Sequence, residues 1–287
     1  MNRANLWRLE LGRRIGMGYA ANPKARVVMI AGSTGRGAAD RYSDLEIDVY
    51  WSEPPTDEER RAAAEAGGGT LLDLWPYEED EWAEEIDVGG FHIGTSTFLV
   101  ETMERYLTEV LDRYSTEPLP QIRLSSLLHA RTLTGEDLVE RWRARASAYP
   151  PELARAVVRQ NLTFQGFGYG EDMLVARDDP IALHDVISGV ARQILGALLG
   201  LNGVYLPNPS FKGMDALIAE LRLTPPDLAS RLRGALRLPP ARGVEELHAL
   251  IDDVFDLVDR HLPDVDTDPY RSQMRRRRPV WDHPPEG

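Results

Sequence analysis

The chain contains a short apolar run that ends in a glycine-rich turn, and this feature limits its fold more than any other. Residues 26–31 are almost wholly apolar and rich in β-branched side chains, which is the pattern of a buried strand. Residues 32–37 (Gly-Ser-Thr-Gly-Arg-Gly) turn away from that strand. Residues 45–51 then alternate apolar and acidic side chains, which predicts a second strand. The sequence therefore predicts a β-sheet with a polar turn between its first two strands.

The remaining elements divide the chain into two regions. A third strand is expected over about residues 90–98. Helical periodicity predicts helices over about residues 5–19, 57–66, 99–114, 181–201 and 244–262. After the proline-containing residues 115–120 the pattern is almost wholly helical. We therefore expect an α+β protein with a mixed β-sheet and flanking helices in residues 1–116, an all-α helical bundle in residues 117–265 and a basic, proline-rich tail in residues 266–287.

Two acidic residues beside the turn form the candidate site. Asp44 and Glu46 lie two apart in a predicted strand, so their side chains leave the same face. Two carboxylates suit magnesium, which completes its coordination with phosphate oxygens and water. Gly32 and Ser33 supply flexible backbone and free amides that can approach phosphates closely. The pattern indicates a site that holds a nucleoside triphosphate and its metal ions side by side.

The spacing of these residues resembles the signature of the DNA polymerase β-like nucleotidyltransferase superfamily. Gly32-Ser33 stands eleven positions before Asp44-Leu45-Glu46, and this order is similar to that of the minimal and antibiotic-modifying branch. The resemblance covers residues 32–46. It implies a nucleotidyltransferase-type sheet and a two-magnesium site at Asp44 and Glu46. It also implies transfer of a nucleoside monophosphate, AMP from Mg-ATP in the simplest case, to a hydroxyl of an antibiotic-like small molecule.

A looser resemblance concerns bacterial proteins that pair such a domain with a helical region. It rests on Asn202, Tyr205 and Lys212, and it implies that Lys212 approaches a phosphate of the nucleotide. An exposed lysine at a helix start is the alternative. Arg36 likewise has two interpretations, as a phosphate contact or as a surface ion-pair partner of Asp40.

One expected acid is absent from the motif. The family usually adds a third carboxylate from a neighbouring strand, and here Gly94 falls at that position. Asp48 shares the face of Asp44 but lies roughly 13 Å away along an extended strand. Asp87 and Glu101 flank the third strand and would replace the missing acid only if the backbone bends. The resemblance therefore implies nucleotide binding more directly than catalysis.

Other residues have competing interpretations. One of the acids at 171–172 or 178–179 would serve as a general base, although Asp179 ahead of Pro180 fits a helix N-cap better. An aromatic cluster is expected in an acidic loop over residues 76–85, where it either lines an acceptor pocket or packs on the sheet edge; its members are Trp75, Tyr77 and Trp82.

The composition of the chain limits the binding partners and the cellular location that we expect for it. The net charge of −13 argues against a long nucleic-acid acceptor, because binding to phosphates calls for a basic face. The chain has no cysteine, which excludes disulfides, and three histidines lack zinc spacing and fit core or surface positions, namely His92, His129 and His184. No run of about 18 apolar residues occurs and the N-terminus lacks a signal-peptide core, so we expect a cytoplasmic protein without a membrane span.

Three functions therefore stand. The leading hypothesis is a nucleotidyltransferase that uses Mg²⁺ and a nucleoside triphosphate to modify a small hydroxyl acceptor. The second is a catalytically impaired nucleotide-binding or regulatory protein, such as the partner of a toxin, which the glycine at 94 favours. The third is modification of a protein or an RNA end, which has only the basic run at residues 275–278 in its favour. A homodimer is compatible with the sequence but is not indicated by it.

Overall fold

The computed structural model describes residues 2–281 and forms two compact units. The first contains the chain up to residue 113 together with residues 119–148, and the second contains residues 114–118 and the chain from residue 149. The expected division fell near Thr116. Residues 119–148 belong with the first unit because they add a strand and two covering helices to its sheet.

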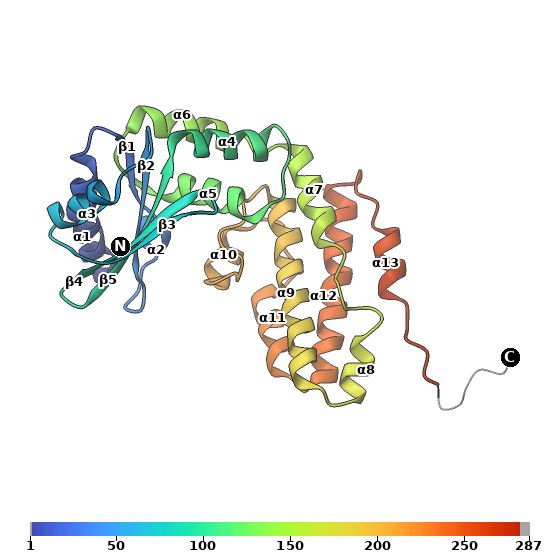
Figure 1. Ribbon diagram of the computed structural model, residues 1–287. Helices are drawn as coiled ribbons and strands as arrows, with labels where there is room; N and C mark the ends of the chain where they lie inside the picture. The colour runs from blue at the N-terminus through green and yellow to red at the C-terminus, as the bar shows by residue number, and fades with distance from the viewer. Residues whose placement is uncertain (1, 282–287) are drawn as a thin grey trace. The chain divides into compact units, whose positions relative to one another are not determined.

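The first unit is built on a mixed six-stranded sheet in the order β3-β4-β5-β2-β1-β6 (Figure 1). Only the pair β2 and β5 is parallel, and the other neighbours are antiparallel. The strands are β1 (Ala25–Ile30), β2 (Leu45–Trp51), β3 (Thr70–Glu78), β4 (Glu81–Val88), β5 (Phe91–Leu99) and β6 (Arg131–Thr134). The strands expected from the sequence at β1, β2 and β5 are confirmed, and so is the α+β class.

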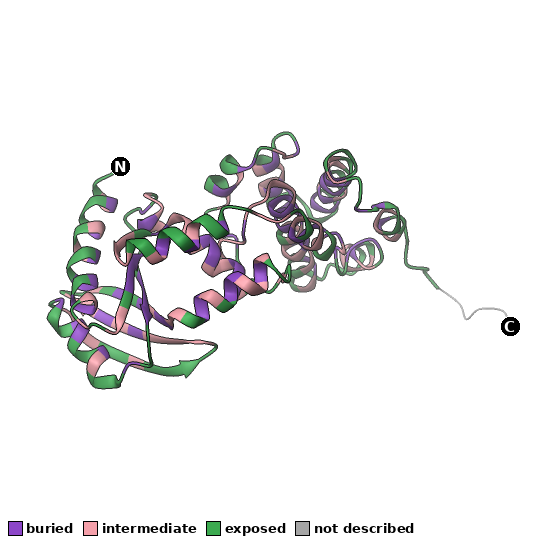
Figure 2. Cartoon of the chain, turned by 90° about the horizontal axis from the view of Figure 1, so that it is seen from above, coloured by how far each residue is buried: buried purple, intermediate pink, exposed green. Residues whose placement is uncertain are grey.

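Three strands were missed. The segment expected as an acidic loop over residues 76–85 is part of the β3–β4 hairpin, whose outer strand β3 is largely exposed (Figure 2). Strand β6 lies in a region expected to be helical, and it pairs with β1. Both errors have the same origin, because a four-residue strand and an exposed edge strand carry little of the apolar alternation that identifies a buried strand.

Helices cover both faces of this sheet. They are α1 (Arg3–Ala20), α2 (Gly32–Gly35), α3 (Asp57–Ala66), α4 (Val100–Leu111), α5 (Pro118–His129) and α6 (Glu136–Ala146). Side chains of α1 and α3 join the core on one face, whereas α5 and α6 contact the other face through Asp48 and Tyr50 (Figure 1).

Helix α1 approaches the sheet through glycines. A Cβ at Gly12 would lie 2.9 Å from Ile30 Cδ1, and one at Gly16 would lie 2.6 Å from Leu133 Cδ1. Large apolar residues of this helix do not all lie on its inner face, since Leu6 and Met17 are 51% and 47% exposed. At these glycines the backbone of α1 itself, and not a large side chain, packs against the sheet.

The described part of the second unit is helical. Its helices are α7 (Pro151–Asn161), α8 (Glu171–Ala176), α9 (Pro180–Asn202), α10 (Met214–Glu220), α11 (Leu228–Arg237), α12 (Pro240–His261) and α13 (Asp268–Met274). The helices expected at 181–201 and 244–262 are α9 and α12, and both contribute many residues to one core. Asp179 caps α9 ahead of Pro180, as expected, and its side chain accepts from the Ala182 amide.

Two features of this unit bear on sequence expectations. By length and composition alone α9 would suffice to cross a membrane, but half of its most apolar window is buried within the protein, as in the core helix of a folded domain. Part of the expected tail is ordered as α13, and Arg277 pairs with Asp172 at 3.4 Å. The prolines at 284 and 285 lie outside the described residues.

Candidate functional site

The glycine-serine turn and the acidic strand meet at one place in the first unit. Helix α2 starts directly after β1, and Gly32 adopts a positive φ of 57°. A Cβ at Gly32 would lie 2.7 Å from Glu46 Cδ, so any other residue would have to displace this carboxylate, and the positive φ also favours glycine. The Ala31 amide donates to the Glu46 carbonyl at 2.9 Å. The predicted neighbourhood of Gly32 and Glu46 is therefore present in the fold.

Both predicted acids lie on the surface. Asp44 immediately precedes β2 and Glu46 is on it, and both are exposed, whereas Leu45 and Ile47 are fully buried on the other face. Among residues 2–281, no group of three or more histidine or acidic side chains is placed to hold a metal ion. Two carboxylates alone suit a magnesium ion that takes its other ligands from phosphate and water.

Helix α1 holds the loop that carries these residues. Asn5 is fully buried; its side-chain amide donates to the Thr34 carbonyl at 3.4 Å and its oxygen accepts from the Ala39 amide at 3.1 Å. Arg8 is also buried, and its guanidinium donates twice to the Ser43 carbonyl, at 3.0 and 2.6 Å. Two polar side chains of one helix thus fix the turn and the residue before Asp44. The sequence pattern gave no sign of this role, because polar residues on a helix are usually exposed.

Gly94 lies where the third acid was expected. In the parallel pairing of β2 and β5 it is directly opposite Glu46, and a Cβ at Gly94 would meet no atom within 4 Å. On the next strand Glu85 is opposite Gly94, and its carboxylate contacts His92 Nδ1 at 2.5 Å. The surface beside Glu46 is therefore open at Gly94, and the next acid on that face is one strand further away.

The two flanking acids do not replace the missing one. Asp87 accepts from the Gly90 amide, at 3.0 Å to Oδ1, and so belongs to the β4–β5 turn. Glu101 is in the first turn of α4, beyond the opposite end of β5. The backbone makes no bend that would bring either one to Gly94, since β4 and β5 pair without a register shift.

Asp48 belongs to a buried polar cluster rather than to the surface site. It is 2% exposed, accepts from Ser126 Oγ at 2.9 Å and lies 3.8 Å from Arg123, which also pairs with Glu81 at 2.5 Å. Burial raises the pKa of Asp48, and Arg123 acts in the opposite direction. Its contacts attach α5 to the sheet.

The other candidates are spread over both units. Arg36 follows α2, and its guanidinium donates to Ser125 Oγ at 3.1 Å. Lys212 is in the second unit, where its side chain is exposed and its amide donates to Asn208. Asn202 bonds the 222–223 backbone and Tyr205 packs on Tyr149, so both have structural roles in that unit. A contact of Lys212 with nucleotide phosphate stays a prediction.

The aromatic cluster and the candidate general base Glu171 also have structural contacts. Tyr77 and Trp82 pack at 4.4 Å between ring centroids, and Trp75 is 43% exposed on the edge strand. Glu171 is buried and contacts His248 Nε2 at 2.9 Å. Burial acts to raise the pKa of Glu171, but the contact with His248 and hydrogen bonds from backbone amides together outweigh it, and the pKa lies below its usual value.

Comparison with known proteins adds little. No known protein family matches the chain, and no curated protein matches it. One similar solved structure is a nucleotidyltransferase-like protein from Exiguobacterium sibiricum 255-15, at 12% sequence identity and a TM-score of 0.42. The match covers 88% of this chain and 74% of that one. A likeness this weak does not bear on the site, whose interpretation depends on the residues themselves.

Proposed function

We propose that the first unit binds a magnesium nucleotide between the α2 turn and the start of β2. One observation carries the proposal: Gly32, in a conformation that favours glycine, brings the backbone of the α2 turn directly against the carboxylate of Glu46. The first amides of a helical turn have no partner inside it, and they favour an anion. The exposed carboxylates suit the metal ion of a metal-phosphate ligand, and the free amides beside them suit its phosphate.

We further propose that the protein is a nucleotidyltransferase. The acceptor hydroxyl attacks the α-phosphorus of the triphosphate, the bond to the bridging oxygen breaks, and pyrophosphate and the hydroxyl proton are released. Bound magnesium would stabilise charge on the phosphate oxygens. Asp44 and Glu46 would hold the metal, Gly32 and Ser33 would position the phosphates, and Arg36 would supply positive charge. A small, antibiotic-like hydroxyl compound is the proposed acceptor, and ATP the proposed donor.

A second function is favoured by a specific observation. Gly94 leaves the position opposite Glu46 without an acid, and among the described residues no group of three acids is placed to hold a metal ion. A protein that binds nucleotide without transferring it, and acts as a regulatory partner, is consistent with this gap. Nucleotide binding is common to both functions, whereas release of pyrophosphate belongs to the first alone.

The decisive experiment is calorimetric titration of ATP, GTP, CTP and UTP into the full chain, with and without magnesium. Asp44→Asn and Glu46→Gln are compared with Glu10→Gln, which removes an exposed acid from α1. We expect magnesium-dependent binding in the wild type, a loss of at least tenfold in the two site variants and no change in the control. Pyrophosphate release with small hydroxyl acceptors then separates the enzyme from the regulatory protein.

Two results would contradict the proposal. If the wild type binds none of the four nucleotides, residues 32–46 serve the fold alone. If Asp44→Asn and Glu10→Gln bind Mg-ATP equally well, the metal-phosphate ligand lies elsewhere.

A further inference from the structure

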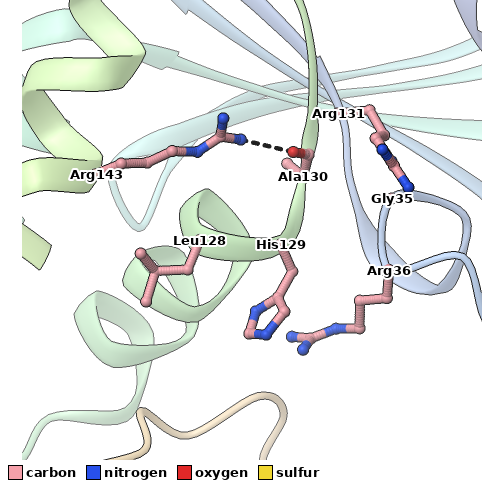
Figure 3. Close-up of a pocket in the computed structure, with 7 residues that line it drawn as sticks. All are labelled: Gly35, Arg36, Leu128, His129, Ala130, Arg131 and Arg143. Carbon is pink, nitrogen blue, oxygen red and sulfur yellow. Dashed lines mark hydrogen bonds between the residues drawn. The ribbon is translucent and has the colours of Figure 1, made fainter. Parts of the chain in front are cut away.

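A pocket of about 340 Å³ opens beside the α2 turn. It lies where the end of α2, the end of α5, the start of β6 and helix α6 meet, all within the first unit (Figure 3). Its lining consists of Gly35, Arg36, Leu128, His129, Ala130, Arg131 and Arg143. Gly35 closes one wall, since a Cβ there would lie 3.2 Å from the Ala130 Cα. The first residue of α2 thus faces Glu46 and its last faces this pocket.

The lining is positive in a chain that is strongly negative. Three of the seven lining residues are arginines, one is a histidine and none is acidic, although the chain carries a net charge of −13. These residues are far apart in the sequence, so the fold gathers them. Glu140, one turn before Arg143 on α6, acts on that arginine electrostatically but does not line the pocket.

Arg143 and His129 are held in place by backbone carbonyls. Arg143 donates to Leu127 O at 2.9 Å and to Ala130 O at 2.6 Å, which ties α6 to the end of α5. Burial lowers the pKa of Arg143, but an arginine stays charged at neutral pH. His129 Nδ1 contacts the Ser125 carbonyl at 2.8 Å, so its ring is oriented and its other nitrogen is available (Figure 3). These carbonyl partners neutralise no charge.

Arg36 and Arg131 complete the pocket. The guanidinium of Arg36 points toward the His129 ring, and the side chain of Arg131 runs beside the α2 turn with its guanidinium near Gly35 (Figure 3). Arg131 is exposed and makes no ion pair with any residue from 2 to 281. Guanidinium groups bind phosphate oxygens in a forked geometry.

We infer that this pocket is a binding site for a phosphate group, held by Arg36, His129 and Arg131 on a frame set by Arg143. The ligand is either a free phosphate or pyrophosphate ion, or the end of a nucleotide's phosphate chain. Binding of a phosphate group here does not depend on the proposed nucleotidyltransferase activity. Arg36 is shared with the proposed nucleotide site, whereas His129 and Arg131 are assigned to the pocket alone.

The test is calorimetric titration of inorganic phosphate and pyrophosphate, without magnesium, into the full chain. The double variant Arg131→Gln, His129→Gln removes two of the proposed contacts. Arg61→Gln is the matched control, because Arg61 is an exposed arginine on α3, over the other face of the sheet. We expect the double variant to weaken binding at least tenfold and the control to leave it unchanged. Circular dichroism melting confirms that the variants are folded.

Further measurements identify the source of the phosphate. If the double variant binds Mg-ATP as the wild type does, the ligand is a free ion; if it also loses Mg-ATP affinity, the nucleotide's phosphate chain enters the pocket. Asp44→Asn should bind inorganic phosphate normally, so failure of the nucleotide site does not count against the pocket. The inference is overturned if the wild type binds neither ion at millimolar concentration, or if Arg61→Gln weakens binding as much as the double variant does.

Discussion

The Cα of Gly32 lies so close to the carboxylate of Glu46 that a Cβ on it would be 2.7 Å from Glu46 Cδ. Gly32 also has a φ of 57°, a backbone conformation that side chains disfavour. Strain and steric exclusion therefore coincide at one residue. They have different consequences, and they can be separated by comparison with a second glycine of the same loop.

Gly32→Ala should displace the Glu46 side chain and weaken magnesium-dependent nucleotide binding at least tenfold. Gly37→Ala is the matched control, since Gly37 has a φ of 78° but open space where its Cβ would be. Both variants should lose about 1 kcal/mol of stability through backbone strain. Titration of Mg-ATP and urea unfolding measure the two effects. Equal losses of affinity in both variants would mean that the contact with Glu46 does not matter.

Asn5→Ala should loosen the loop between Thr34 and Ala39, because both of its hydrogen bonds to that loop are lost. Leaving buried polar groups without partners costs about 1–3 kcal/mol. We expect a loss of stability in this range, measured by urea unfolding, together with weaker nucleotide binding. Leu6→Ala, on the exposed side of α1, should change neither quantity appreciably. Unaltered nucleotide affinity in a destabilised Asn5→Ala would show that the loop does not need this support.

Gly94→Asp should place a third carboxylate beside Glu46. The position is open, and Gly94 does not have a positive φ, so the backbone accepts a side chain there. We expect Mg²⁺ or Mn²⁺ to bind several-fold more tightly in the presence of nucleotide, because each added carboxylate favours a hard cation. Gly94→Asn supplies the same shape without the charge and should show no gain. If both variants bind metal like the wild type, the position opposite Glu46 is outside the metal site.

The pH dependence of stability should contain a contribution from Glu59 in the capping box of α3. Hydrogen bonding from the Thr56 amide, with Lys24 nearby, lowers the pKa of Glu59 to about 2 from its usual 4.5. Because the folded-state pKa is lowered, the contribution is complete above about pH 4.5 and is lost as the pH falls toward 2.

Glu59→Gln should therefore cost about 0.5–1 kcal/mol at pH 6, since the pair with Lys24 is partly exposed. The difference from the wild type should shrink as the pH is lowered to 3. Urea unfolding at both values measures it. Glu58→Gln, at the next position in the same first turn, serves as the control. A cost for Glu59→Gln that is identical at pH 6 and pH 3 would contradict the assignment.

The elements that could be predicted from sequence are those in which the local order of apolar and polar residues matches the order of buried and exposed side chains. Strand β2 was predicted at its observed limits because it alternates strongly, and α3 because a run of glycines directly follows its last residue. The proximity of Gly32 and Glu46 could be expected as well. The two residues adjoin two predicted strands that are close together in the sequence.

The parts that could not be predicted depend on contacts distant in sequence. Asn5 and Arg8 bond residues about 30 positions away, and nothing local distinguishes them from exposed polar residues. The pocket gathers cationic side chains from residue 36 to residue 143. In the sequence, His129 taken by itself is indistinguishable from an ordinary core or surface histidine. Only the three-dimensional course of the chain brings such residues together.

The pairing of β6 with β1 has a consequence for how the first unit can be isolated. A fragment that ended at Thr116 would lack β6, and residues 28–30 of β1 would lose their partners on that side. The open edge would offer unpaired backbone amides and carbonyls to another strand, which promotes aggregation. Residues 131–134 thus act as a protective border for the central strands, although they come after a chain segment that belongs to the other unit.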